Sequence, residues 1–243
     1  MQPTQRTART AGVLYLIIIV AGIFAQFFVR MSLIDPTDAA ATAAAVQGAE
    51  ALFRMGIAAD LVMIAADVAI AIAFFLLLEP VSRGLSLLAA FFRLVQATIL
   101  GFNLMNLFVG LELVTGGAGH LGAVGEGERQ SLALMFFEAH GTGYAVGLAF
   151  FALSLALVGY LIYRSGYLPK FLAVLLMIAA AGYMADTLAR TLLTDYAAVQ
   201  PVFDMVVFAP AVIAEVATAA WLLILGVRTP GTASQAGARP ARA

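Results

Sequence analysis

Ionisable side chains inside long apolar segments are the residues of this sequence that could carry out chemistry. A charge near the middle of a membrane costs about 2.5–3.5 kcal/mol on insertion scales, so these groups should face one another or a water-filled cavity. Carboxylates and a histidine placed together could bind a small polar or cationic ligand, or act as a metal-independent acid and base. The ionisable residues within apolar segments are Asp60, Asp67, Arg93, Glu138, His140, Asp186, Arg190 and Glu215.

Asp60 and Asp67 are seven residues apart and therefore share one face of a helix. The loop that follows, residues 79–85, is short, so its two flanking segments form an antiparallel hairpin. Residues equally distant from the loop then lie at the same depth, which places Asp67 level with Gln96 and within one turn of Arg93. We predict a buried Asp67–Arg93 pair that is extended by Gln96.

The same depth rule places Asp60 level with Asn103. We predict that Asp60 forms a hydrogen bond with Asn103 or Asn106. Gly143 and Gly147 are four residues apart, and this spacing of small residues is typical of a site where two membrane helices approach closely.

A second predicted hairpin turns at residues 164–170. It places Tyr144 opposite Arg190, with His140 slightly further from the turn. Asp186 and Arg190 are four residues apart, so these two side chains can also pair on their own helix.

Glu215 lies near the middle of the last apolar segment, just beyond Pro210. Because proline has no N–H group, it frees a carbonyl and kinks the helix. Apart from Arg93, the polar groups gather in the middle or the outer half of the membrane, which predicts a polar pocket open to the outside. The candidate binding residues are Asp60, Asp67, Arg93, Gln96, Asn103, His140, Tyr144, Asp186, Arg190 and Glu215.

The sequence offers little for a metal or a cofactor. It has no cysteine and only two histidines, His120 and His140. It also lacks a His-Glu-x-x-His motif, a Gly-rich phosphate loop, a Gly-x-Ser-x-Gly motif and paired haem histidines in its apolar segments. We therefore expect no metal and no cofactor.

The elements that position these groups must be membrane helices. The 243-residue chain is 63% hydrophobic and only 11% charged, against about 45–50% and about 25% in soluble domains. Its mean hydropathy is +1.00. A net charge of −1 gives no basic surface for nucleic acid. The apolar segments do not alternate apolar and polar residues as the strands of a membrane β-barrel do. The expected partner is the lipid bilayer.

About 20 apolar residues are needed to cross a bilayer, and the sequence supplies six such segments. They cover residues 11–29, 57–78, 86–111, 132–163, 170–189 and 205–227. We predict an all-α, six-helix transmembrane bundle as a single domain over residues 11–228, with an N-terminal tail at 1–10 and a disordered C-terminal tail at 229–243. A short surface helix should follow the first span, with Asp35 as a possible N-cap and Pro36 in the first helical position.

Orientation follows from the basic residues beside the spans, because Lys and Arg concentrate on the cytoplasmic side. With both termini inside, the inner group comprises Arg6, Arg9, Arg83, Arg164, Lys170, Arg228, Arg239 and Arg242, and the outer group comprises Arg30, Arg54, Arg129 and Arg190. The distribution therefore predicts cytoplasmic N- and C-termini.

Six stretches of the sequence carry a further signal, namely residues 11–16, 52–54, 60–61, 88–96, 159–169 and 182–186. Together they resemble an uncharacterised family of bacterial integral membrane proteins, of the domain-of-unknown-function type (DUF4386-like). The resemblance covers roughly residues 9–228. It implies a multi-pass protein of the bacterial inner membrane, and it implies no activity and no catalytic residue.

Three functions remain open at this stage. The first is binding or transport of a small polar or cationic ligand through the polar cluster. The second is a structural or partner-binding role, in which the buried polar residues are interhelical hydrogen bonds worth about 0.6 kcal/mol each. The third, and least favoured, is an intramembrane enzyme. The sequence leaves the oligomeric state open.

Overall fold

The computed structural model describes residues 4–116 and 124–228, and six of its helical segments are long and apolar enough to cross a membrane. Each crossing is helical because a helix satisfies its own backbone N–H and C=O groups. No strand occurs in the described residues, so the predicted all-α fold with six spans is confirmed. The spans are α1, η1 and α2 (Gln5–Ile23, Phe24–Arg30 and Met31–Leu33), α4 (Glu50–Leu78), α5 (Arg83–Thr115), α6 (Glu126–Ser165), α7 (Lys170–Leu192), and α8, η3 and α9 (Gln200–Phe203, Asp204–Phe208 and Ala209–Ile224).

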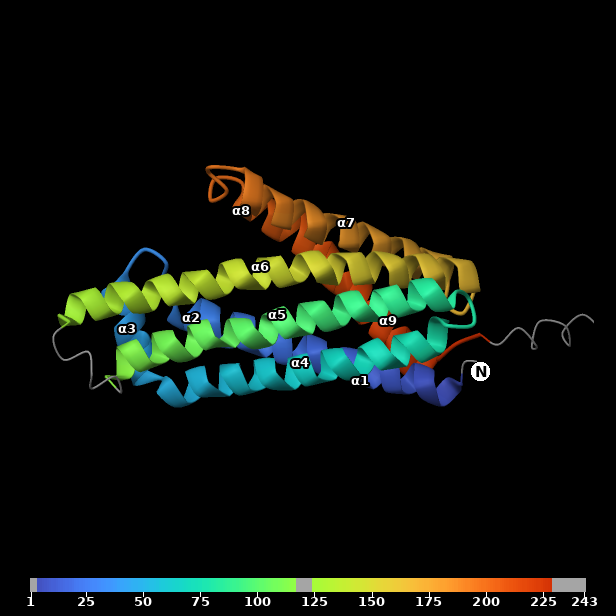
Figure 1. Cartoon of the computed structure of the whole chain (residues 1–243), viewed down its shortest axis with the longest axis horizontal. Coiled ribbons are helices and arrows are strands. Elements are labelled where there is room, and N and C mark those ends of the chain that lie inside the picture. The colour runs from blue at the N-terminus through green and yellow to red at the C-terminus, as the bar shows by residue number, and fades with distance from the viewer. Residues whose placement is uncertain (1–3, 117–123, 229–243) are drawn as a thin grey trace, which may run out of the picture.

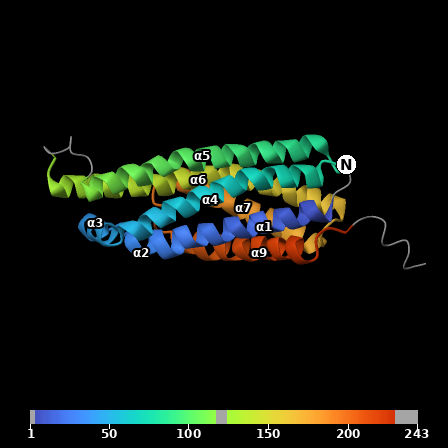
Figure 2. The same ribbon diagram turned by 90° about the horizontal axis from the view of Figure 1, so that it is seen from below.

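Both described ends of the chain lie at the same end of the bundle (Figures 1 and 2). The Gln5 side-chain amide donates to the Val227 carbonyl at 2.6 Å. The Arg228 N–H donates to the Tyr167 carbonyl at 2.9 Å, which ties in the α6–α7 turn. We call this end of the bundle the terminal end. The opposite end holds a short helix, α3 (Ala39–Gly48), and we call it the α3 end. The predicted tail at 229–243 lies outside the described residues.

Direct contact between the first and last spans closes the bundle. Figure 2 shows α1 beside α9, and the two helices pack against each other along the terminal half. A Cβ at Gly12 would lie 2.7 Å from the Leu223 backbone nitrogen, so only glycine allows this approach. The main apolar core, which includes Leu77, Leu161 and Leu176, surrounds this contact.

A short helix, α3 (Ala39–Gly48), follows the first span, as predicted. Its N-cap is Asp38, whose side chain accepts a hydrogen bond from the Ala41 N–H at 2.8 Å, so the expectation that Asp35 caps the helix is wrong. Asp35 instead accepts from the Thr37 hydroxyl at 2.7 Å and the Thr37 N–H at 2.8 Å. These two bonds, the hydroxyl first, lower the pKa of Asp35.

Two spans contain π-helical turns, η1 near the end of the first and η3 near the start of the last. η3 ends two residues before Pro210, which lies in the first turn of α9, and the kink at this proline stays a prediction. A π-helical turn widens the helix by one residue and rotates the side chains that follow it. In the first span this places Arg30, the last residue of η1, inside the bundle with only 8% of its surface exposed.

Candidate functional site

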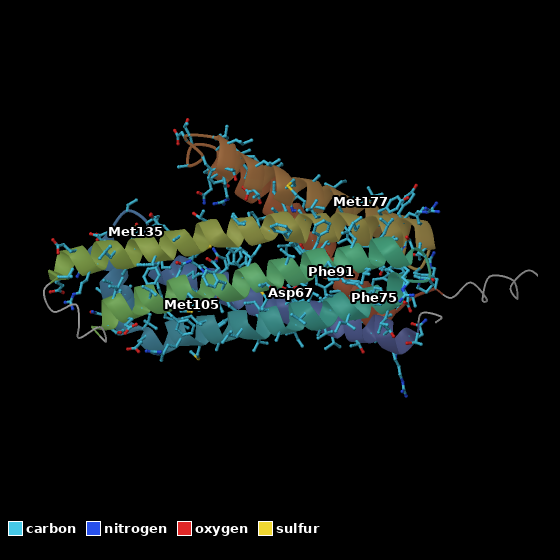
Figure 3. All side chains as sticks on the ribbon, viewed as in Figure 1. Asp67, Phe75, Phe91, Met105, Met135 and Met177 are labelled. Atoms are coloured by element: carbon cyan, nitrogen blue, oxygen red, sulfur yellow. The ribbon has the colours of Figure 1, made fainter. Side chains whose placement is uncertain are left out.

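A group of buried polar side chains lies near the middle of the bundle, and Figure 3 labels one of its members, Asp67. Tyr15, Asp67, Arg93, Gln96, Tyr183 and Glu215 make up what we call the central cluster. Each is at most 8% exposed. They come from five of the six spans, namely those built on α1, α4, α5, α7 and α9, and α6 contributes Phe151 beside them.

Arg93 and Asp67 form the ion pair predicted from the hairpin. Arg93 Nε donates to Asp67 Oδ1 at 2.8 Å, and Nη2 lies 2.6 Å from the same oxygen. Gln96 Nε2 donates to the second carboxylate oxygen at 3.2 Å. The predicted Asp67–Arg93–Gln96 arrangement is confirmed, and it links α4 to α5.

Aromatic rings flank the Arg93 guanidinium. Its central carbon lies 4.8 Å from the centroid of Phe151 and 5.8 Å from that of Tyr15. A cation above a ring face is attracted by the ring quadrupole, and the attraction grows when water is excluded. The two rings therefore stabilise the Arg93 guanidinium, which is buried away from water.

Glu215 is the second carboxylate of the central cluster. The Tyr183 hydroxyl donates to Glu215 Oε1 at 2.8 Å. The Tyr15 hydroxyl is also close to Glu215 but forms no hydrogen bond of ordinary geometry. Gln96 Oε1 likewise has no hydrogen-bond partner among the described residues. The cluster therefore combines two carboxylates and one guanidinium with a buried amide oxygen, Gln96 Oε1, that has no partner among the described residues.

Asp60 pairs with Arg30, not with Asn103 or Asn106, so that prediction is wrong. Arg30 Nη1 lies 2.5 Å from Asp60 Oδ2, and the two side chains are 9% and 2% exposed. The prediction considered only the α4–α5 hairpin, whereas η1 on the first span rotates Arg30 toward α4. The distribution of basic residues places Arg30 in the outer group, just beyond the predicted span 11–29.

Asn103 instead contacts α6. Its side-chain amide lies 3.0 Å from His140 Nδ1 and donates to the His140 carbonyl at 2.8 Å, while Asn106 donates to Asn103 Oδ1 at 2.9 Å. A Cβ at Gly143 would overlap Asn103 Oδ1, and one at Gly147 would lie 2.8 Å from Leu100. The predicted close helix approach at these glycines is confirmed.

Asp186 and Arg190 pair on α7, as predicted, with Arg190 Nε donating to Asp186 Oδ2 at 3.0 Å. The Tyr196 hydroxyl donates to Asp186 Oδ1 at 2.5 Å, and the Arg190 guanidinium lies 4.3 Å from the Tyr196 ring. Tyr144 is directed toward α4 instead of Arg190, because its hydroxyl contacts Met63 Sδ at 3.9 Å.

The ten candidate residues thus separate into distinct groups. Asp67, Arg93, Gln96 and Glu215 share the central cluster. The other groups are the Arg30–Asp60 pair, the Asn103–His140 contact with Tyr144 beside it, and the Asp186–Arg190 pair. Within residues 4–116 and 124–228, no three His, Asp or Glu side chains lie together as metal ligands would.

Comparison with known proteins places the chain in a family. The family described as "Domain of unknown function (DUF4386)" matches residues 10–226, which include the whole central cluster. The chain belongs to the DUF4386 family. An "Uncharacterized protein" of Archaeoglobus fulgidus is 32% identical over 124 residues, covering 51% of this chain and 60% of that protein. No solved structure matches. The resemblance to DUF4386 is therefore confirmed, and these comparisons add no activity.

Sequence reasoning missed Arg30, Tyr15 and Tyr183 as members of the polar groups of this DUF4386 protein. A signal for the two tyrosines was present, because a phenol hydroxyl in the middle of an apolar span needs a hydrogen-bond partner. No such signal existed for Arg30, since its inward position depends on the π-helical turn.

Proposed function

We propose that this protein binds, and moves across the membrane, a small polar cation that occupies the central cluster. The observation that carries the proposal is the balance of charge. Two buried carboxylates, Asp67 and Glu215, face a single guanidinium, Arg93. With all three groups ionised, the cluster has a net charge of −1 at a depth where each charge costs about 2.5–3.5 kcal/mol.

A bound cation would remove this imbalance. Asp67 is already paired with Arg93 and Gln96, whereas Glu215 accepts a hydrogen bond from the neutral Tyr183 hydroxyl and has the Tyr15 hydroxyl close by. Gln96 Oε1 has no hydrogen-bond partner among the described residues, and an ammonium group donates to oxygen atoms of this kind. Glu215 is therefore the expected counter-charge of the ligand.

Thermal unfolding of the purified protein in detergent tests this proposal. We expect methylammonium or guanidinium to raise the unfolding temperature, because a ligand at about one hundred times its Kd stabilises the native state by about 2.7 kcal/mol. Glu215→Gln should abolish the rise. The matched control is Glu138→Gln, which changes an exposed side chain of α6 and should leave the rise unchanged. A rise that persists in Glu215→Gln would contradict the proposal.

The Arg30–Asp60 pair favours a structural role for part of the polar set. This pair is balanced, one charge against one, and it joins the first span to α4. We expect Asp60→Asn to lower stability and leave the cation-induced rise intact. Loss of the rise in Asp60→Asn would assign this pair to the binding site as well.

The proposed location is the bacterial inner membrane with the terminal end in the cytoplasm. Because the chain has no cysteine, single cysteines can be placed at Thr4, at the terminal end, and at Ala40, on the exposed surface of α3. We expect a membrane-impermeant thiol reagent added to intact cells to label the cysteine at position 40 only. Labelling at position 4 alone would reverse the orientation.

A further inference from the structure

An apolar groove with a volume of about 480 Å³ lies between α7 and the segment formed by α8, η3 and the start of α9. The α7 wall includes the small residues Ala181, Gly182 and Ala185, and the opposite wall includes Phe203 and Val206. Ligand pockets in proteins measure about 300–1,000 Å³, so this groove is large enough for a ligand. It does not involve the central cluster's charged groups.

The groove is wide because the α7 side chains that line it are small. α7 touches η3 at Gly182, where a Cβ would lie 2.9 Å from Val207 Cγ1. On either side of this contact, Ala181 and Ala185 are exposed and leave the space unfilled. Val206, on the opposite wall, is 62% exposed. Since both walls belong to spans, the surrounding medium is hydrocarbon, and an apolar chain is the occupant that suits this lining.

A cationic group lies beyond one end of the groove. The Phe203 ring, which lines the groove, lies 6.0 Å from the Tyr196 ring, and Tyr196 in turn lies beneath the Arg190 guanidinium. Arg190 is five residues beyond Ala185, or about 7.5 Å further along the helix axis. It is in the last turn of α7, at the end of this span, and Figure 1 shows this end of α7 standing away from α6.

We propose that the groove holds an acyl chain of a glycerophospholipid whose phosphate binds Arg190. Arginine donates to phosphate oxygens through a planar fork of N–H groups. Asp186 takes the Nε donor and is fully buried, whereas 29% of the Arg190 side chain is exposed. The guanidinium therefore keeps donors for a phosphate while Asp186 fixes its position.

Native mass spectrometry of the detergent-purified protein, titrated with palmitoyl-oleoyl phosphatidylglycerol, tests this site. We expect one lipid molecule per protein molecule to bind more tightly than any further lipid molecule. Filling the groove with the Ala181→Leu/Ala185→Leu double variant should remove that lipid. Ala58→Leu, which enlarges an exposed residue of α4 outside the groove, should retain it.

The contact between Arg190 and the lipid phosphate is tested separately. Asp186→Asn is included in these variants so that removing the charge of Arg190 does not leave an unpaired carboxylate. Asp186→Asn should keep the tight lipid, and Asp186→Asn/Arg190→Gln should weaken it at least tenfold. Arg54→Gln is the control, since Arg54 also pairs with a carboxylate four residues away, Glu50 on α4, but this pair is exposed and lines no such groove. This comparison decides the proposal even if the double leucine variant does not fold.

Three results would overturn the proposal. The first is a wild-type protein that retains no lipid more tightly than the rest. The second is equal lipid binding by Asp186→Asn and Asp186→Asn/Arg190→Gln. The third is a wild-type dimer that the leucine variant converts to a monomer, which would make the groove a contact between two copies of this chain.

Discussion

Asp67 and Arg93 form the buried ion pair of the central cluster. Removing one charge or both tests whether this pair is worth more than an ordinary contact between membrane helices. The variants are Asp67→Asn, Arg93→Gln and the double variant. All three keep side chains of similar size, and Asp67→Asn keeps an acceptor for Gln96. The free energy of unfolding of each variant then closes a double-mutant cycle.

The expected magnitude follows from burial. Arg93 and Asp67 are 2% and 1% exposed, so either charge left alone stays in the bundle without water. Breaking such a pair by removing one partner costs about 3–5 kcal/mol. The double variant leaves neither charge, so we expect a coupling energy of about 3 kcal/mol, roughly a hundredfold in the unfolding equilibrium constant.

The two single variants should not be equal. Arg93→Gln leaves two carboxylates, Asp67 and Glu215, without a cation, whereas Asp67→Asn leaves Arg93 close to Glu215. We therefore expect Arg93→Gln to be the more destabilising change.

Unfolding in mixed micelles of increasing dodecyl sulfate content, followed by circular dichroism, measures these free energies. The control cycle pairs Asp67→Asn with Arg54→Gln, whose side chain is exposed, and should be additive. Interhelical hydrogen bonds in membrane bundles average about 0.6 kcal/mol. A coupling energy at that level for Asp67 and Arg93, or equal effects of the two single variants, would refute the reasoning.

Two further predictions concern contacts that hold the helices together. Gly143→Leu should destabilise the fold by about 1–3 kcal/mol because its side chain would overlap Asn103, whereas Gly141→Leu, with open space around it, should be nearly neutral in the same unfolding assay. Tyr183→Phe removes the hydrogen bond to Glu215 and should lower the free energy of unfolding by about 1.5–3 kcal/mol. The control Tyr160→Phe, on the exposed surface of α6, should lower it by less than about 0.5 kcal/mol. Equal losses in the two variants would contradict the importance of the bond to Glu215.

The sequence was sufficient for the six spans and for contacts within one tight hairpin. The loop between α4 and α5 is short, so counting from it predicts which residues of the two helices are level, and Asp67 meets Arg93 and Gln96 as expected. The same count is nearly right between α6 and α7, where the Thr187 hydroxyl donates to the Ala145 carbonyl at 3.1 Å.

Contacts between helices joined by long connections could not be predicted this way. Asn103 and His140 lie on α5 and α6, and the connection between these helices is too long to fix their relative depth. Arg30 reaches Asp60 because a π-helical turn changes the rotation of the first span, and neither propensity nor hydrophobic spacing indicates such a turn. Glu215 joins the central cluster through the α1–α9 contact, which brings together opposite ends of the sequence.

The most direct test of the proposed cation site uses a single cysteine at Thr218, a fully buried residue three positions after Glu215 on α9. Labelling rates are compared for a cationic aminoethyl and an anionic sulfonatoethyl methanethiosulfonate. We predict that the cationic reagent reacts at least tenfold faster and that Glu215→Gln, but not Glu138→Gln, removes this preference. No reaction with either reagent, while a cysteine at Ala40 is fully labelled, or equal rates for the two reagents, would contradict the existence of the site.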